Sequence, residues 1–402
     1  MKPFSFVHAA DLHLGYAQYN IDARREDFER TFNELVEKTI ELKPDFMIIA
    51  GDLFQHARPS NKTLEMAITN FRRLREAGIP VLAVDGSHDS APNVITGTIL
   101  NPLDSAGLLC YLPRRPGASW ENESCYVYGV PNFRTKRRTM ELLPEFMERK
   151  PPHPRQDLFN IFVFHMALDL PNLKPSRMEA EGSLQMLPKG FQYYAGGHIH
   201  IPYELQLDDG VLVYSGSIET VSYEEAEVEK GFYYVEVAGD GVPTLHRVKL
   251  ESPRPFIVLD QDYTEMPPAQ IVESVVRRIR EVDRDGVVIV PILRGVLPMG
   301  ASRGEIDLVR IREAAERALL VHPMLLLRER EVPEEVVRSI FEGEMRDLRT
   351  KAFEYFRELF TSRYGEAEAE RVAKLALEIL EPLARGDEER VKEELERFIH
   401  ED

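Results

Sequence analysis

Acidic and histidine side chains gather in five short segments of the chain. They are Asp11-Leu12-His13, Gly51-Asp52-Leu53-Phe54, Gly86-Ser87-His88-Asp89, His165, and Gly197-His198-Ile199-His200. One such segment by itself is more often a capped turn than a ligand. All five, however, begin within two residues of the end of a predicted strand, and ligand sites form at the carboxyl ends of strands in layered α/β folds. Together the five segments predict a single binding site.

The types of these side chains indicate a pair of divalent metal ions. Carboxylates and imidazoles without thiolates suit Mn²⁺, Fe²⁺ or Zn²⁺ better than Ca²⁺. A carboxylate that bridges two ions holds them about 3.5–4 Å apart, and the pair lowers the pKa of a shared water and stabilises both the attacking and the leaving oxygen of a phosphoryl group. In an extended chain, His198 and His200 point to the same side and Ile199 points away. The segments therefore predict hydrolysis of a phosphate ester.

The first half of the chain alternates short apolar runs with stretches of helical periodicity, which is typical of a layered α/β domain. The predicted strands are Phe4–Ala9, Phe46–Ala50, Val81–Val84, Cys125–Val130, Leu158–Phe164, Tyr193–Ala195 and Val211–Tyr214, followed by a hairpin of Phe232–Val237 and Leu245–Leu250. One helix is predicted over Phe28–Ile40, and Asn61 is predicted to cap a second helix that ends before Gly78. This domain is expected to cover residues 1–251.

The pattern changes around Ser252-Pro253-Arg254-Pro255, where a small α/β module of residues 252–330 is expected to begin. Its predicted elements are strand Phe256–Leu259, helix Ile271–Val282, strand Val287–Leu293, a helix near Glu305–Leu320, and strand Met324–Leu327. Residues 331–402 form a third region that is charged and of helical periodicity. Such a tail is either a solvated helix pair or a helical hairpin that binds a partner.

Charge and composition limit the function classes. The 402 residues contain 50 Lys and Arg against 68 Asp and Glu, a net charge of −18. An acidic chain lacks a broad electrostatic grip on nucleic acid, so a polyanionic substrate must be held locally, by metal ions or a small basic patch. No apolar run approaches the roughly 18 residues of a membrane span, no secretory signal is evident, and Cys110 and Cys125 are too few for a disulfide framework. We expect a protein without membrane contact, cytoplasmic or associated with the nucleoid.

The motifs resemble those of the calcineurin-like metallophosphoesterases from Phe4 to about Leu250. Within that superfamily the chain looks most like the nuclease subunit of the DNA double-strand-break repair complex, the SbcD type of bacteria and its archaeal counterparts. The further segments that carry this resemblance are Leu14-Gly15-Tyr16, Arg58-Pro59-Ser60, Tyr193-Tyr194-Ala195-Gly196, Tyr214-Ser215-Gly216-Ser217-Ile218-Glu219, Lys230-Gly231-Phe232 and Arg254-Pro255-Phe256. The implied fold class is α/β, a layered metallophosphoesterase fold of mixed β-sheets flanked by helices, with a small capping domain and a helical C-terminal tail.

The resemblance also implies two metal sites that share one carboxylate. The first would be formed by Asp11, His13, Asp52 and His200, and the second by Asp52, His165 and His198. His88 is implied as the general acid that protonates the leaving oxygen, with Asp89 orienting its ring. The implied cofactor is two Mn²⁺ ions, with Mg²⁺, Fe²⁺ and Zn²⁺ as alternatives. The implied reaction is hydrolysis of DNA phosphodiesters, as a 3′-to-5′ exonuclease and as an endonuclease.

Two positions depart from the family pattern. Ser87 stands where the family has Asn, whose amide oxygen completes the shell of the second metal. Because Ser is shorter, direct ligation requires the backbone to move closer, or else a water fills the gap; we expect weaker binding of the second ion. In addition, Gln55 follows Asp-Leu-Phe where the family often has His. His56 comes next, and it either replaces that group or is a surface residue.

The densest basic run of the chain is Arg134-Thr135-Lys136-Arg137-Arg138. It is either a solvated helix start or a contact to the phosphate backbone of DNA through Lys136, Arg137 and Arg138.

The resemblance implies macromolecular partners as well. The helix Asn61–Ala77 and the segment Asn93–Leu108 correspond to the part through which the similar nucleases form a homodimer. Residues 334–402 correspond to the part that grips the coiled coil of an ABC-type ATPase. The leading hypothesis is therefore a metal-dependent nuclease that acts on duplex ends and single strands in double-strand-break repair, together with that ATPase.

Two other functions fit the same residues. One is a phosphodiesterase or phosphatase for small molecules, which the capping module and the helical tail disfavour. The other is a scaffold that binds DNA ends for the ATPase, with catalysis weakened because of Ser87.

Overall fold

The computed structural model describes residues 1–91, 97–171, 173, 179–330, 345–385 and 387–400. The chain divides into two compact units, residues 1–254 and 255–402. The boundary between them lies close to the change in pattern predicted around residue 252. The other expected boundary, at residue 331, falls on residues 331–344, which lie outside the described residues.

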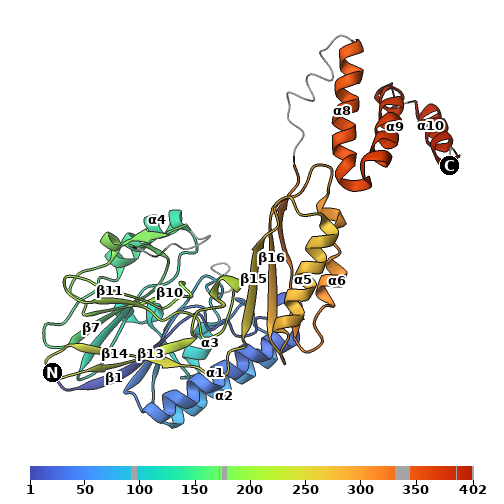
Figure 1. Cartoon of the computed structure of the whole chain (residues 1–402). Coiled ribbons are helices and arrows are strands. Elements are labelled where there is room, and N and C mark those ends of the chain that lie inside the picture. The colour runs from blue at the N-terminus through green and yellow to red at the C-terminus, as the bar shows by residue number, and fades with distance from the viewer. Residues whose placement is uncertain (92–96, 172, 174–178, 331–344, 386, 401–402) are drawn as a thin grey trace. The chain divides into compact units, whose positions relative to one another are not determined.

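The first unit contains two six-stranded sheets (Figure 1). In spatial order, the first sheet consists of β14 (Pro243–Lys249), β13 (Gly231–Val237), β1 (Phe4–Ala9), β2 (Phe46–Ala50), β3 (Val81–Val84) and β4 (Cys110–Tyr111). The second consists of β11 (Tyr203–Gln206), β12 (Val211–Tyr214), β10 (Tyr193–Gly197), β7 (Phe159–His165), β6 (Cys125–Gly129) and β5 (Ser119–Glu121). Strands β1 to β4 are parallel, and so are β6, β7, β10 and β12.

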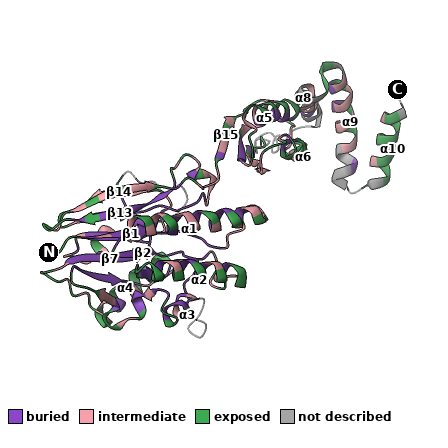
Figure 2. Ribbon diagram, turned by 90° about the horizontal axis from the view of Figure 1, so that it is seen from below, coloured by how far each residue is buried: buried purple, intermediate pink, exposed green. Residues whose placement is uncertain are grey.

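Helices cover the outer faces of both sheets. Helices α1 (Asp22–Leu42), α2 (Asn61–Glu76) and α3 (Leu100–Ser105) pack on the first sheet, and α4 (Lys136–Arg149) packs on the second. Figure 2 shows α1 and α2 side by side, and their buried residues, among them Phe32 and Phe71, pack in the core with strand residues of the first sheet. Successive residues of a strand face opposite sides of the first sheet. Val7 and Ile49 contact the helices, whereas Phe6 and Ile48 face the second sheet.

Apolar side chains on both faces explain why the central strands read as continuous hydrophobic runs. The strand registers place the carboxyl ends of neighbouring central strands side by side. Ala9 pairs with Ile49 across β1 and β2, and His165 pairs with Gly197 across β7 and β10. The loops that follow these strands therefore start at one edge of the two-sheet core.

The structure corrects several predicted elements of this unit. Strands β1, β2, β3 and β12 match the prediction residue for residue. The predicted cap of α2 was wrong by one residue, because the hydroxyl of Ser60, not Asn61, accepts a hydrogen bond from the backbone N–H of Thr63 at 3.1 Å. Edge strand β11, helix α3, most of α4, and the short pair β8 (Leu168–Asp169) and β9 (Gly182–Ser183) were not predicted.

The second unit contains a four-stranded parallel sheet of β15 (Phe256–Asp262), β16 (Val288–Val296), β17 (Leu320–Val321) and β18 (Met324–Arg328), with α5 (Pro268–Val282) and α6 (Leu308–Arg312) packed on it. The helix predicted near Glu305–Leu320 is present only as the short α6, which ends at Arg312. Beyond it, the carboxylate of Asp283 accepts hydrogen bonds from the backbone N–H groups of Glu316, Arg317 and Ala318 and so holds these three residues in a loop.

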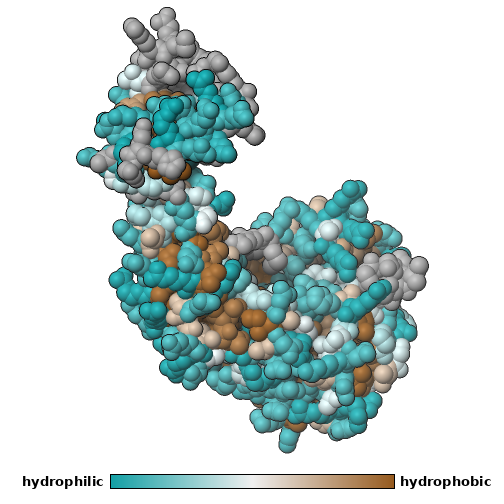
Figure 3. Space-filling model, turned by 90° about the vertical axis from the view of Figure 1, so that its right-hand side faces the viewer, coloured by the Kyte–Doolittle hydropathy of each residue, from teal (hydrophilic) through white to brown (hydrophobic). Residues whose placement is uncertain are grey.

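The predicted helical tail is present as α8 (Met345–Tyr364), α9 (Glu366–Arg385) and α10 (Glu388–His400). Over the described ranges, every helix is too short or too polar to span a lipid bilayer. The face of the molecule in Figure 3 is mostly hydrophilic, in keeping with a net charge of −18.

Candidate metal centre

The five segments singled out in the sequence meet at the carboxyl edge of the two sheets. Asp11 follows β1, Asp52 follows β2, and His88 follows β3, while His165 ends β7 and His198 follows β10. Backbone hydrogen bonds tie the loops after β1 and β2 to each other, including Leu12 N to Asp52 O at 2.9 Å and His13 N to Asp52 O at 3.0 Å. The site is thus built by chain segments up to almost two hundred residues apart.

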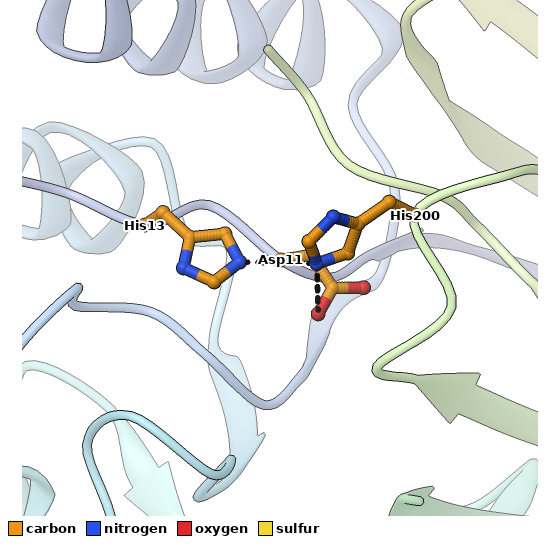
Figure 4. Close-up of side chains that lie close together, drawn as sticks. All are labelled: Asp11, His13 and His200. Atoms are coloured by element: carbon orange, nitrogen blue, oxygen red, sulfur yellow. Dashed lines mark hydrogen bonds and ion pairs between the residues drawn. The ribbon is translucent and has the colours of Figure 1, made fainter. Parts of the chain in front are cut away.

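Three overlapping groups of side chains offer ligand atoms to a cation. Asp11, His13 and His200 form the first group, and Asp52, His165 and His198 the second, while His13 and Asp52 form a third with the exposed His88; within each, the ligand atoms all lie within 4.8 Å of one another. Figure 4 shows the first group converging, with Nε2 of His13 3.3 Å from Nε2 of His200. Carboxylates and imidazoles turned toward a common point fit a divalent transition metal.

Asp52 lies between the two groups. Its Oδ2 is 3.2 Å from Nε2 of His165 and 4.0 Å from Nε2 of His13. Burial alone would raise the pKa of the Asp52 carboxyl, but the neighbouring imidazoles of His165 and His13 hold it well below its ordinary value. A fully ionised, buried carboxylate between two sets of imidazoles is the arrangement that a bridge between two cations requires.

The imidazoles differ in their protonation. Burial lowers the pKa of both His13 and His198 to about 3, so these rings are neutral and ready to bind a metal. Burial would also lower the pKa of His165, but Asp52 and Asp11 raise it to about 10. Because metal ligands must be deprotonated, a cation held by His165 would displace a proton from its ring.

Three imidazoles are held from behind by hydrogen bonds through Nδ1. The partners are Gln55 Oε1 for His13 at 2.9 Å, the Ala50 carbonyl for His165 at 2.8 Å, and Glu225 Oε1 for His200 at 2.8 Å. Each bond leaves Nε2 to face the centre. The sequence pattern marks Gln55 only as a departure from the family, and it does not distinguish Glu225. His56 is exposed, so the residue behind His13 is Gln55.

Glycines permit the close approach of these segments. A Cβ atom on Gly197 would lie 1.9 Å from the Ala50 carbonyl oxygen, and one on Gly86 would lie 2.1 Å from Oδ1 of Asp52. Any larger residue at either position would push the two sheets or the loops apart.

The structure corrects the predicted role of Asp89. The exposed ring of His88 places Nδ1 3.0 Å from the backbone carbonyl of Gln55, which orients it. Asp89 is buried and instead accepts from the backbone N–H groups of Gly86 at 2.7 Å and Phe54 at 3.2 Å. Burial and the nearby Asp52 raise the pKa of Asp89 to about 7. Asp89 therefore braces the loop that carries His88, because its oxygens are already used by the backbone.

Ser87 lies beside the Asp52 carboxylate. Its hydroxyl donates to Oδ2 of Asp52 at 3.2 Å, and the backbone N–H of His88 donates to Oδ1 at 2.8 Å. On the other side of the second group, Oε2 of Glu181 lies 3.8 Å from Nε2 of His198. Nothing in the sequence indicated Glu181, which lies directly before β9.

The basic run is divided between two roles. Arg134 is exposed, and its guanidinium donates to Oγ of Ser90 at 2.5 Å and to the Ser90 carbonyl at 2.9 Å. Lys136, Arg137 and Arg138 form the exposed first turn of α4. Lys136 pairs with Glu179 at 2.6 Å and Arg137 with Glu141 at 3.0 Å, both in solvent-exposed positions where ion pairs are weak.

Comparison with known proteins gives a consistent set of similarities. The model of the calcineurin-like phosphoesterase family matches residues 4–202. The DNA double-strand break repair protein Mre11 of Methanopyrus kandleri is 30% identical over 347 residues, which cover 82% of this chain and 72% of that protein. The protein of the same name from Archaeoglobus fulgidus is 29% identical over 420 residues, which cover 98% of this chain and 90% of that protein.

Proposed function

Since this chain belongs to the family of the Mre11 DNA double-strand break repair proteins and contains a calcineurin-like phosphoesterase domain, we propose that it is a metal-dependent nuclease that hydrolyses DNA phosphodiesters in double-strand-break repair. The observation that carries this proposal is the position of Asp52 between two groups of imidazoles. A phosphodiester needs two oxygens stabilised at once, and two cations with a shared carboxylate provide this.

The proposed ligands of the first cation are Asp11, His13, Asp52 and His200, and those of the second are Asp52, His165 and His198. When bound, the pair of ions supplies an activated water and neutralises charge on the phosphoryl oxygens. Protonation of the leaving oxygen is the proposed role of His88. Its Nδ1–H donates to the Gln55 carbonyl, which turns Nε2 outward to protonate the leaving oxygen.

We propose Mn²⁺ as the cation at both positions, because Mn²⁺ accepts mixed carboxylate and imidazole ligands. The hydroxyl of Ser87 donates its proton to Asp52, so the lone pairs of its oxygen remain available to a water or a cation. The second cation lacks the amide oxygen of the family and should bind more weakly than the first.

The experiment is cleavage of a labelled DNA duplex with Mn²⁺, read beside the number of Mn²⁺ ions bound. His88→Ala should lose about 10²- to 10⁴-fold in rate, the usual contribution of a general acid, and should still bind both ions. His56→Ala is the matched control, because His56 is an exposed imidazole one residue beyond Gln55, and it should cleave as the wild type does. Full cleavage by His88→Ala would remove the general acid from the mechanism.

Ser87 favours one second candidate, a scaffold that binds DNA ends with little catalysis. Ser87→Asn decides between the two. If the protein is a nuclease, the wild-type chain should cleave DNA, and Ser87→Asn should increase its affinity for the second Mn²⁺. A scaffold should bind DNA without cleaving it until Asn restores the missing oxygen ligand.

For the partners, we propose a coiled-coil ABC-type ATPase at the helical tail α8–α10, and a homodimer through α2. Segment Asn93–Leu108, the other part proposed for the dimer, lies partly outside the described residues. A chain that ends at Arg330 should keep its bound metal and lose co-elution with the ATPase. Co-elution of the shortened chain would contradict the assignment of the tail.

A further inference from the structure

Three segments that accompany the metal-binding motifs in the sequence contribute no ligand. They are Tyr214-Ser215-Gly216-Ser217-Ile218-Glu219, the turn that contains Glu225, and Lys230-Gly231-Phe232. In the structure, Ser217, Glu225 and Lys230 meet directly behind His200. All three residues are buried, with exposed fractions of 4% or less.

The contacts form a chain that ends at the imidazole. Nδ1 of His200 donates to Oε1 of Glu225 at 2.8 Å. The other oxygen of Glu225 accepts from Oγ of Ser217 at 2.9 Å and from Nζ of Lys230 at 2.5 Å. Lys230 also donates to Oγ of Ser217 at 2.8 Å. Both oxygens of the carboxylate are therefore fixed, one by the ring and one by the buried ammonium.

Local structure alone does not account for this arrangement. Glu225 completes a capping box with Ser222 at the 3-10 turn Tyr223–Glu225, with Ser222 N donating to Oε1 at 3.1 Å. A capping box needs no buried lysine beneath it, and a buried ion pair is no more stabilising than well-packed apolar side chains. Stability alone therefore does not explain the buried ion pair of Glu225 and Lys230.

The three imidazoles held through Nδ1 have unequal partners. His13 donates to the neutral amide of Gln55, and His165 to a backbone carbonyl, but His200 donates to an anion. A carboxylate behind an imidazole fixes its tautomer and increases the electron density that the other nitrogen offers to a metal.

We propose that Glu225 is a positioning residue for the first cation: held by Lys230 and Ser217, it fixes His200 with Nε2 directed at Asp11 and strengthens it as a ligand. This inference rests on the ligand set proposed above. Loss of a carboxylate behind a metal-binding histidine typically costs about 10- to 100-fold in metal affinity, and that is the effect expected here.

The test is calorimetric titration of the metal-free full-length chain with Mn²⁺. His165→Ala dismantles the second group, so that the titration in this background reports the first. Adding Glu225→Gln should weaken Mn²⁺ binding by about 10- to 100-fold. Glu219→Gln is the matched control, because Glu219 is a buried carboxylate in the same loop region that pairs with the buried Arg24 at 3.2 Å and not with an imidazole.

Equal Mn²⁺ affinity with and without Glu225→Gln would overturn the inference and leave the metal centre intact. Absence of Mn²⁺ binding by the wild-type chain would instead refute the proposed metal centre itself. Affinity lost equally in Glu219→Gln would also overturn the inference, because the effect would then be one of general loosening.

A pair of further variants separates positioning from folding. Lys230→Met leaves Glu225 as an unpaired buried charge and should lower the thermal midpoint, whereas the double variant Glu225→Gln with Lys230→Met restores a neutral core and should recover the midpoint. The positioning role predicts that the double variant still binds Mn²⁺ about 10- to 100-fold more weakly. Recovery of both the midpoint and the affinity would show that the cluster acts only in folding.

Discussion

Gly86 is a position where a single added methyl group should disrupt the metal centre. A methyl group there would lie 2.1 Å from Oδ1 and 2.3 Å from the backbone N of Asp52. Carbon contacts settle near 3.5 Å, so the two segments must separate by more than about 1 Å. Because one of the contacted atoms belongs to the backbone, rotation of the Asp52 side chain cannot relieve the clash.

That separation would pull the Gly86–Asp89 loop away from Asp52. The hydrogen bonds at risk are those of His88 N at 2.8 Å and Ser87 Oγ at 3.2 Å, and His88 would leave its place beside the leaving oxygen. A displacement of about 1 Å at a catalytic group costs on the order of 10²-fold in rate, or about 2.7 kcal/mol of barrier. Gly86→Ala should therefore cleave duplex DNA on the order of 100-fold more slowly than wild type.

The assay compares cleavage rates at saturating Mn²⁺, with circular dichroism to verify the fold. Gly239→Ala serves as the control, because its new Cβ would meet nothing closer than 3.5 Å and should leave the rate unchanged. A folded Gly86→Ala protein with the wild-type rate would refute the reasoning, since the loop would then tolerate displacement without effect on the reaction.

Three further outcomes follow from the same site and its surroundings. Burial raises the pKa of the Asp85 carboxyl from 3.8 to about 6, so the folded state favours the protonated acid. The free energy of unfolding should therefore fall as the pH rises from about 4 to 6. Asp85→Asn should remove this loss, at most about 3 kcal/mol, as measured by urea unfolding at both pH values. Reversing the charges of Lys136, Arg137 and Arg138 should weaken DNA binding and reduce the slope of log affinity against log salt by up to about 0.9 per lost phosphate contact; an unchanged slope would exclude the patch. Mn²⁺ at about 100 times its Kd should stabilise the wild type by about 2.7 kcal/mol per site, and Asp52→Asn, which removes the shared carboxylate, should lose most of this gain in thermal unfolding.

The buried strands were the most predictable part of the fold. Phe46–Ala50 and Val81–Val84 are covered on both faces, so each reads as an unbroken apolar run bounded by polar or turn residues. Edge strand β11 alternates exposed and half-buried residues and gave a weaker signal. The helix expected near Glu305–Leu320 is shortened to Leu308–Arg312, because Asp283, more than thirty residues away, binds the backbone N–H groups of Glu316 to Ala318; such a tertiary contact overrides local periodicity.

The candidate ligands could be predicted for a different reason, namely that only certain side chains bind metals. The residues behind them could not. Glu225 lies 25 positions from His200, and nothing in the sequence distinguishes it from the other glutamates of an acidic chain. The error at Asp89 has the same origin: it follows His88 directly in sequence, yet its carboxylate points to the backbone of Phe54 and Gly86.

Backbone conformation adds a final link between the metal centre and the stability of the fold. Asp11, His13, Asp52 and His198 all adopt left-handed φ angles, of 55°, 46°, 48° and 90°. Each costs on the order of 1 kcal/mol or more in a residue with a Cβ atom, and such strain persists only where the surrounding structure enforces it. The strain arises because side chains leaving different strand ends must all turn back toward one point. A cation bound at that point would stabilise the strained conformation of these loops, so metal binding and folding of the loops should be thermodynamically coupled.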